Sequence, residues 1–276
     1  MSLQFSQARQ RLYHLSRAYA PRLAEAAFWI AQEEYPSLVP TEALAELDRM
    51  AQELRSRLPE EPYPLKIIQA IKRYLFQDLG FVGNEAEYYD PRNSYLNKVL
   101  DRRRGIPITL SLIYLELAHQ VGFPMEGINF PGHFLIRPVS DECEFFVDPF
   151  NQGEILFLQD CREKLSQVVG QDVEMSARFL QPITSQSFLV RMLNNLKHIY
   201  LSHQDVERSL AACERILLVD PTQIDELRDR GLLYFQMGRW HEARQDICDY
   251  LRESGHAEDR DMLNKLLRQI DQDSAH

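Results

Sequence analysis

Two short segments near the middle of the chain decide the fold: Gly132-His133-Phe134-Leu135-Ile136-Arg137 and Phe145-Phe146-Val147-Asp148-Pro149. Apolar residues recur at alternate positions in both, and a polar turn over residues 138–144 separates them, which is typical of a β-hairpin. If the hairpin is symmetric about that turn, His133 lies opposite Asp148. Opposed side chains in a sheet lie about 4.5–5.5 Å apart at Cβ, so we expect a hydrogen bond between this imidazole and this carboxylate.

A histidine oriented by a carboxylate forms part of a nucleophile–histidine–acid triad. The segment from Arg104 to Pro124 precedes the pair in the chain and is expected to form one helix. Pro107 suits a first helical turn, and Gly122 and Pro124 stop the helix. Apolar residues occupy nearly every face of this segment, which predicts a buried central helix.

The order of these elements resembles the transglutaminase-like core of the papain-type cysteine hydrolases. In that family a Gly-x-Cys sequence opens the central helix, and the histidine and the acid follow on successive strands. Gly105-Ile106 matches the first two positions, His133 the histidine and Asp148 the acid, but Pro107 stands where the family has its cysteine. The resemblance therefore implies that this chain lacks the family's thiol chemistry.

Ser111 is the alternative nucleophile. It lies about one helical turn beyond the position of the family's cysteine, roughly 6 Å farther along the axis. Thr109 is expected to point away, and Cys143 lies at the wrong end of the hairpin to meet His133. Three hypotheses stay open for His133 and Asp148: a structural pair, a small-ligand pocket, and a hydrolase or acyl transferase of the amidase or protease kind that uses Ser111 or an activated water.

A longer set of motifs narrows the resemblance. The run from Asn93 to Ser111, the run from Gly132 to Arg137, and Asp148-Pro149-Phe150-Asn151 are similar to the SirB-type bacterial proteins. In these a transglutaminase-like domain precedes tetratricopeptide repeats. The resemblance implies an α+β fold, with a helix-rich transglutaminase-like core, a small antiparallel sheet and an all-α tail. We expect the core and an N-terminal helical subdomain over residues 1–182, and the repeat module over residues 183–276.

The C-terminal third of the chain shows a 34-residue period. Residues of similar character that far apart include Leu193 and Leu227, Tyr200 and Tyr234, and Ser209 and Ala243. This is the helix–turn–helix spacing of tetratricopeptide repeats. We expect two repeats, followed by a capping helix over about residues 258–272.

Repeat modules of this kind bind peptides or proteins on a concave face. By resemblance, the groove positions include Arg191, Asn194, His198 and Arg228, and guanidinium groups bind carboxylates bidentately. We therefore expect a protein or an acidic peptide as the partner, and favour a non-catalytic adaptor over a hydrolase. The groove holding part of the chain itself is the alternative, and the sequence leaves the oligomeric state open.

The segment 84–90 is expected to be a loop over the histidine site. Tyr88, Tyr89 and Tyr95 either wall that site or pack within the core. The basic run Arg102-Arg103-Arg104 precedes the central helix, and we expect its side chains to be salt-bridged or solvated.

Composition limits the remaining classes. A net charge of −10 over 276 residues argues against nucleic acid as a partner. Four cysteines without Cys-x-x-Cys spacing indicate a reducing compartment and predict no metal site, and no cofactor is expected. The chain shows neither a signal-peptide pattern nor a membrane span, so we expect a soluble, cytoplasmic protein without a membrane partner.

Overall fold

The computed structural model describes all residues except 1–5, 61–62, 141–142, 172–173, 256–257 and 274–276. Two residues of the predicted hairpin turn, Asp141 and Glu142, therefore lie outside the described residues. The chain forms two compact units, Met1–Phe188 and Leu189–His276, and each is described by itself. The domain boundary after residue 182 stays a prediction, because compact units need not be independently folding domains.

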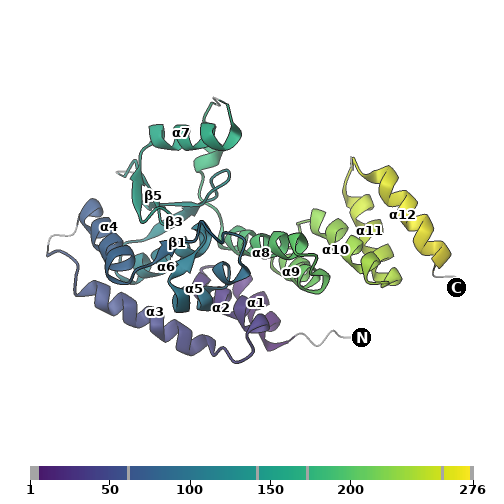
Figure 1. Cartoon of the computed structure of the whole chain (residues 1–276), viewed down its shortest axis with the longest axis horizontal. Coiled ribbons are helices and arrows are strands. Elements are labelled where there is room, and N and C mark those ends of the chain that lie inside the picture. Colours follow the sequence, from purple (N-terminus) through teal and green to yellow (C-terminus); the bar gives the residue numbers. More distant parts are fainter. Residues whose placement is uncertain (1–5, 61–62, 141–142, 172–173, 256–257, 274–276) are drawn as a thin grey trace. The chain divides into compact units, whose positions relative to one another are not determined.

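Helices make up most of the first unit (Figure 1). They are α1 (Gln7–Ser16), α2 (Leu23–Glu34), α3 (Pro40–Arg55), α4 (Pro64–Lys72), α5 (Leu96–Arg102), α6 (Pro107–Gln120) and α7 (Leu158–Val169). The π-helical segment η1 (Arg73–Asp78) continues α4, and short 3-10 turns η2 (Pro91–Asn93) and η3 (Ala177–Leu180) lie in the connections.

The predicted central helix is α6, and its burial is confirmed. Pro107 occupies the first turn, where its missing N–H costs nothing. Polar as well as apolar residues of α6 are buried, among them Thr109, Ser111 and Glu116. The helix contacts α2, α3, α4 and α5 as well as strands β3 and β4, so it lies between the other helices and the sheet (Figure 1).

The main sheet is an antiparallel meander in chain order. Its strands are β3 (Met125–Ile128), β4 (Leu135–Pro138), β5 (Phe146–Asp148) and β6 (Glu154–Leu156). Two further short segments, β1 (Val82–Gly83) and β2 (Arg104–Gly105), form a parallel pair. Helix α7 joins the apolar core of the main sheet through Cys161 and Leu165. A small antiparallel sheet in a helix-rich unit is the predicted α+β architecture.

The predicted register of the hairpin is wrong by two residues. Strands β4 and β5 pair with Ile136 opposite Val147, so Leu135 comes opposite Asp148 and His133 lies beyond the end of β4. The turn between the strands is therefore not symmetric. Because side chains alternate with a period of two, a shift of two residues keeps His133 on the same face as Asp148.

The second unit is all-helical. It contains most of α8 (Ser185–Ser202), then α9 (Val206–Val219), α10 (Asp225–Gln236), α11 (Trp240–Glu253) and α12 (Arg260–Asp273). Helices α9 and α11 have equal length and begin 34 residues apart, which confirms the repeat period. A Cβ on Gly231 would lie 2.8 Å from Ile247 Cγ1, so glycine permits the close contact of α10 with α11. Over the described residues of the whole chain, no helix has the length and apolar character needed to cross a membrane.

Candidate functional site

The predicted imidazole–carboxylate pair is present. His133 Nε2 lies 2.8 Å from Asp148 Oδ2. An ionised carboxylate only accepts hydrogen bonds, so Nε2 carries the proton and Nδ1 is the acceptor nitrogen of the neutral ring. Gly132, just before the histidine, has φ +68°, and a Cβ there would lie 2.9 Å from Val168 Cγ1 on α7. Glycine therefore allows the turn that brings His133 towards the end of β5.

Asp148 is fully buried and is bonded on several sides. Oδ1 accepts hydrogen bonds from the backbone N–H groups of Phe150 and Asn151, both at 3.2 Å, and Oδ2 accepts one from Asn151 Nδ2 at 2.7 Å. Lys164 Nζ on α7 lies 3.3 Å from the same oxygen. Burial alone would raise the pKa of this carboxyl, but the bonds to His133 and Asn151 and the charge of Lys164 outweigh burial and lower its pKa. Asp148 is therefore an ionised turn-forming residue as well as the partner of His133.

The His133 ring forms no hydrogen bond with a nucleophile in the described parts of the chain. Its hydrogen bond is with Asp148, and none is formed there with a hydroxyl or a thiol. Ser111 Oγ is fully buried in α6 and has no hydrogen-bond partner among the described residues. Cys161 lies in the core beneath the sheet, where burial and the charge of Asp160 raise the pKa of its thiol to about 11. A neutral buried thiol is a poor nucleophile.

A loop over residues 84–93, here called the tyrosine loop, reaches the histidine through aromatic rings. The Tyr88 ring meets the Phe150 ring edge-on at 6.0 Å between centroids, and the Phe150 ring meets His133 edge-on at 5.9 Å. Phe150 also lies against the backbone of Gly83, where a Cβ would be 2.7 Å from the phenyl ring. The ring of Phe150 is thus held between β1 and Tyr88.

The three tyrosines that were predicted either to wall the site or to pack within the core lie in different environments. Tyr88 belongs to the aromatic contact just described, whereas the Tyr89 side chain is mostly exposed, at 67%. Tyr95 is buried and meets the Tyr35 ring edge-on at 5.3 Å. Of these residues, Tyr88 is the one that links the loop to His133.

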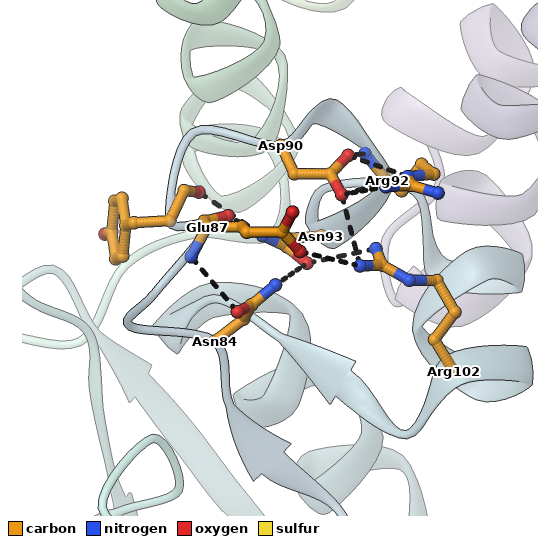
Figure 2. Close-up of polar contacts among 7 residues, drawn as sticks. Asn84, Glu87, Asp90, Arg92, Asn93 and Arg102 are labelled. Atoms are coloured by element: carbon orange, nitrogen blue, oxygen red, sulfur yellow. Dashed lines mark hydrogen bonds and ion pairs between the residues drawn. The ribbon is translucent and has the colours of Figure 1, made fainter.

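Buried amide side chains hold the tyrosine loop in place (Figure 2). Asn84 Nδ2 donates to Asn93 Oδ1 at 3.0 Å, and Asn93 Nδ2 donates to the carbonyl of Glu87 at 2.7 Å. From the end of α5, Arg102 Nη1 donates to the same Asn93 oxygen at 3.2 Å, while Nη2 lies 3.1 Å from Asp90 Oδ2. Arg103 Nη2 also lies 3.6 Å from Glu46 Oε1, so two members of the basic run are salt-bridged.

Further contacts join the tyrosine loop to the start of α6. Thr109 Oγ1 donates to the Asn93 carbonyl at 2.8 Å and accepts a hydrogen bond from the backbone N–H of Ile106 at 3.1 Å. The backbone N–H of Asn84 donates to the Gly105 carbonyl at 3.0 Å. The loop is thus bonded to the turn that leads into Pro107.

The predicted groove residues of the second unit make contacts within the chain. His198 is exposed, and its Nδ1 lies 2.7 Å from the Asn194 carbonyl; Arg191 donates to Asn195. Arg228 lies 2.8 Å from Asp229 and 3.4 Å from Asp259.

Burial would lower the pKa of Arg228, but Asp229 raises it strongly. Asp229 also lies 2.9 Å from Lys197 Nζ, whose buried ammonium bonds to Glu226 as well. Arg228 is therefore part of an ion-pair network between α8, α10 and the segment before α12.

Several of these residues carry no signal in the sequence. Lys164 is one lysine in an amphipathic helix, and Asn84 is a single polar residue in a loop. Asn93 begins one of the motifs quoted above, and Phe150 and Asn151 stand in the motif next to Asp148, so these three residues could have been noticed from the sequence. All four cysteine thiols are free, and no group of metal-binding side chains comes together in the part of the chain that was described.

Comparisons with known proteins agree with this architecture. The sequence profile of the transglutaminase-like superfamily matches residues 41–194, and that of the tetratricopeptide repeat matches residues 196–268. A UPF0162 protein of Xylella fastidiosa is 42% identical over 234 residues, covering 83% of both chains. A UPF0162 protein of Pseudomonas aeruginosa is 31% identical over 227 residues, covering 82% of this chain and 83% of its own. F-box only protein 21 of Homo sapiens is 34% identical over 191 residues, covering 64% of this chain and 29% of its own.

Fold and profiles together define a protein with a transglutaminase-like domain followed by tetratricopeptide repeats, a combination that supports a protein-interaction module. Within the transglutaminase-like superfamily, the chain belongs to the family of the bacterial UPF0162 proteins.

Proposed function

We propose that this protein is a non-catalytic adaptor, which binds another protein through its repeats and uses the transglutaminase-like domain as a structural and binding scaffold. The observation that carries the proposal is the surrounding of His133. Its imidazole is oriented by Asp148, yet it forms no hydrogen bond with a hydroxyl or thiol of any described residue. By resemblance, Pro107 stands at the family's cysteine position, and proline offers neither a thiol nor a proton.

The bonds of Asp148 support this proposal. Its carboxylate closes the turn after β5 through two backbone N–H groups and ties α7 to the sheet through Lys164. These contacts give the His133–Asp148 pair a structural task that needs no nucleophile. A rival hydrolase would require Ser111 or a water, and the buried, unbonded Ser111 hydroxyl gives it little support.

We place the partner's contact on the part of α8 that carries Arg191, Asn194 and His198. His198 is exposed there, whereas Arg228 is engaged by Asp229 and Asp259. A carboxylate of a partner would have to displace those internal ion pairs to reach Arg228. Arg228 therefore supports binding by stabilising the position of α10 through these ion pairs, more than by contacting the partner directly. We also propose that the protein is cytoplasmic and that it is a SirB-type protein.

The catalytic half of the proposal is tested with hydrolysis. Wild-type protein and His133→Ala are incubated with an activated ester and with a glutaminyl peptide plus a primary amine. We expect equal rates for the two proteins, at the level of the buffer. Turnover by the wild type that His133→Ala loses while remaining folded would make the protein an enzyme.

The binding half is tested with a photo-crosslinking amino acid placed at position 198 in the full chain. The matched control places it at position 252, on the exposed Arg252 of α11. We expect one protein to be captured from position 198 and not from 252, and to be captured equally when His133 is changed to alanine. Equal capture from both positions, or loss of capture in a folded His133→Ala protein, would contradict the proposal.

A further inference from the structure

The tyrosine loop contacts the two halves of the family's site. Through Tyr88 and Phe150 it reaches His133, and through Asn93 and Thr109 it reaches the start of α6. We propose that this loop is a strap, latched by Arg102, whose release frees the Phe150 ring and opens access to the His133 imidazole. This inference goes beyond protein binding by the repeats, and holds whether or not His133 takes part in a reaction.

Asn93 is the anchor of the strap. It is fully buried, and its side chain receives hydrogen bonds from Asn84 and Arg102 and donates to the Glu87 carbonyl (Figure 2). Its own carbonyl receives the Thr109 hydroxyl. Such a buried, fully bonded amide is costly to disturb, so this end of the loop stays fixed to α6.

Arg102 is the latch because its contacts differ from those of Asn93. One guanidinium nitrogen bonds to Asn93 and another to Asp90, so a single side chain of α5 spans the loop. The Arg102 side chain is 21% exposed, so water can replace its bonds. When it leaves, Asp90 keeps its second partner, Arg92, at 2.7 Å. Release of the latch therefore leaves no unpaired buried charge.

The side chains at the tip of the loop are mostly exposed, while the backbone carbonyls of Glu87 and Tyr88 stay bonded to Asn93. Glu85, Ala86, Glu87 and Tyr89 are exposed, and Tyr88 provides the ring contact to the neighbouring core. Segments with few buried apolar contacts open at a lower free energy than the whole domain. Opening at Tyr88 removes the brace from Phe150, whose ring packs edge-on against the 16%-exposed side chain of His133. Access to His133 thus depends on residues that do not touch it.

The test measures how fast diethyl pyrocarbonate modifies His133 in the intact protein. Peptide mass spectrometry follows His133 and, as an internal reference, the exposed His198. In Arg102→Ala and in Tyr88→Ala we expect the ratio of the two rates to rise. The rise should be about tenfold in Arg102→Ala, since a charge-assisted hydrogen bond contributes at least that factor to an opening equilibrium. Arg102→Lys, which keeps a cation near Asp90 but cannot span to Asn93, should give an intermediate ratio.

Lys98→Ala is the matched control. Lys98 lies on the same helix and contacts Asp101 at 3.0 Å and the Tyr35 ring, neither of which belongs to the loop, so the ratio should equal that of the wild type. Melting of each variant establishes that the domain stays folded, and a variant that unfolds is replaced by Arg102→Lys, whose ratio should still exceed that of the wild type. An unchanged ratio in both folded Arg102→Ala and folded Tyr88→Ala would overturn the strap. Partner capture by the repeats does not enter this measurement, so the strap and the adaptor can fail separately.

Discussion

The two sides of the His133 imidazole are built differently. On the Nε2 side, Asp148 is bonded to the histidine, to two backbone N–H groups, to Asn151 and to Lys164. By resemblance, the family's nucleophile comes from the start of the central helix, where this chain has Pro107. Of the hydroxyls in that part of α6, Thr109 is bonded to backbone, and Ser111 has no hydrogen-bond partner among the described residues. The orienting half of a triad is therefore present, whereas the described contacts show no attacking half.

Structural contacts alone can therefore account for the histidine–carboxylate pair, without catalysis. Asp148 closes a turn and joins β5 to α7, so the fold needs the carboxylate even if the imidazole does nothing. Pro107 likewise has a local structural role, because proline is well suited to the first turn of a helix. Asp148 and Pro107 are thus each explained by local stability. A nucleophile beside His133 would be needed before catalysis had to be invoked.

The largest effect is expected from Asp148→Ala. Removing this buried carboxylate leaves two backbone N–H groups without their acceptor and breaks the bond to His133, and breaking such a buried pair costs about 3 kcal/mol. Urea unfolding followed by Trp29 fluorescence, in a Trp240→Phe background so that the signal comes from the first unit, measures the loss.

Glu154→Ala is the control for that loss. Glu154 is the second partner of Lys164, at 3.7 Å, and its side chain is 52% exposed, so its removal should cost less than about 0.5 kcal/mol. Equal losses for the two variants would mean that Asp148 is no more structural than a surface carboxylate, and the pair would then need a catalytic explanation.

The stabilisation of the fold by the Asp148 carboxylate should depend on pH. The pKa of Asp148 is lower in the folded protein than in the unfolded chain, so its stabilisation is present above the unfolded value of about 3.9 and is lost as the pH falls through the folded value. The stability difference between wild type and Asp148→Asn should therefore shrink as the pH falls below about 4. A difference that stays unchanged on acidification below about pH 4 would contradict an ionised Asp148.

Part of the fold and of the candidate site could be predicted from the sequence. The alternating segments and the long apolar helix predicted that His133 and Asp148 meet beside a buried α6, and the 34-residue period predicted the repeats. These features rest on periodicity, which local sequence records directly. The register did not follow, because the turn over 138–144 sets it and its polar residues fit several geometries.

The remaining site residues depend on tertiary contacts. Lys164 reaches Asp148 because α7 packs back on the sheet, and Arg102 reaches Asn93 because η2 and α5 bring them together. Arg228 was predicted, by resemblance to the repeat family, to face a partner, whereas it pairs with the adjacent Asp229 and with Asp259, 31 residues later. Side chains that pair across the chain leave no pattern in a single sequence.

Pro107→Cys places a thiol at the position that, by resemblance, holds the family's nucleophile. If Pro107 occupies the place of the nucleophile, the introduced thiol lies at a helix N-terminus beside His133, and both lower a thiol pKa. Its alkylation by iodoacetamide, followed by mass spectrometry, should be about tenfold faster than in the same variant carrying His133→Ala. If His133→Ala makes no difference, the family's nucleophile position lies elsewhere in this fold.

The smallest effect distinguishes two hydroxyls in the same helix. Thr109 Oγ1 is bonded to the backbone of Ile106 and Asn93, so Thr109→Ala should lose about 1–2 kcal/mol. Ser111 Oγ is buried without a partner, and alanine is the better helix former, so Ser111→Ala should be neutral or more stable by up to about 1 kcal/mol. Urea unfolding monitored at Trp29 compares the two variants. A loss of stability in Ser111→Ala as large as in Thr109→Ala would mean that the Ser111 hydroxyl has a bonded partner. A loss of ester turnover with unchanged stability would instead identify Ser111 as the missing nucleophile and complete the second half of the triad.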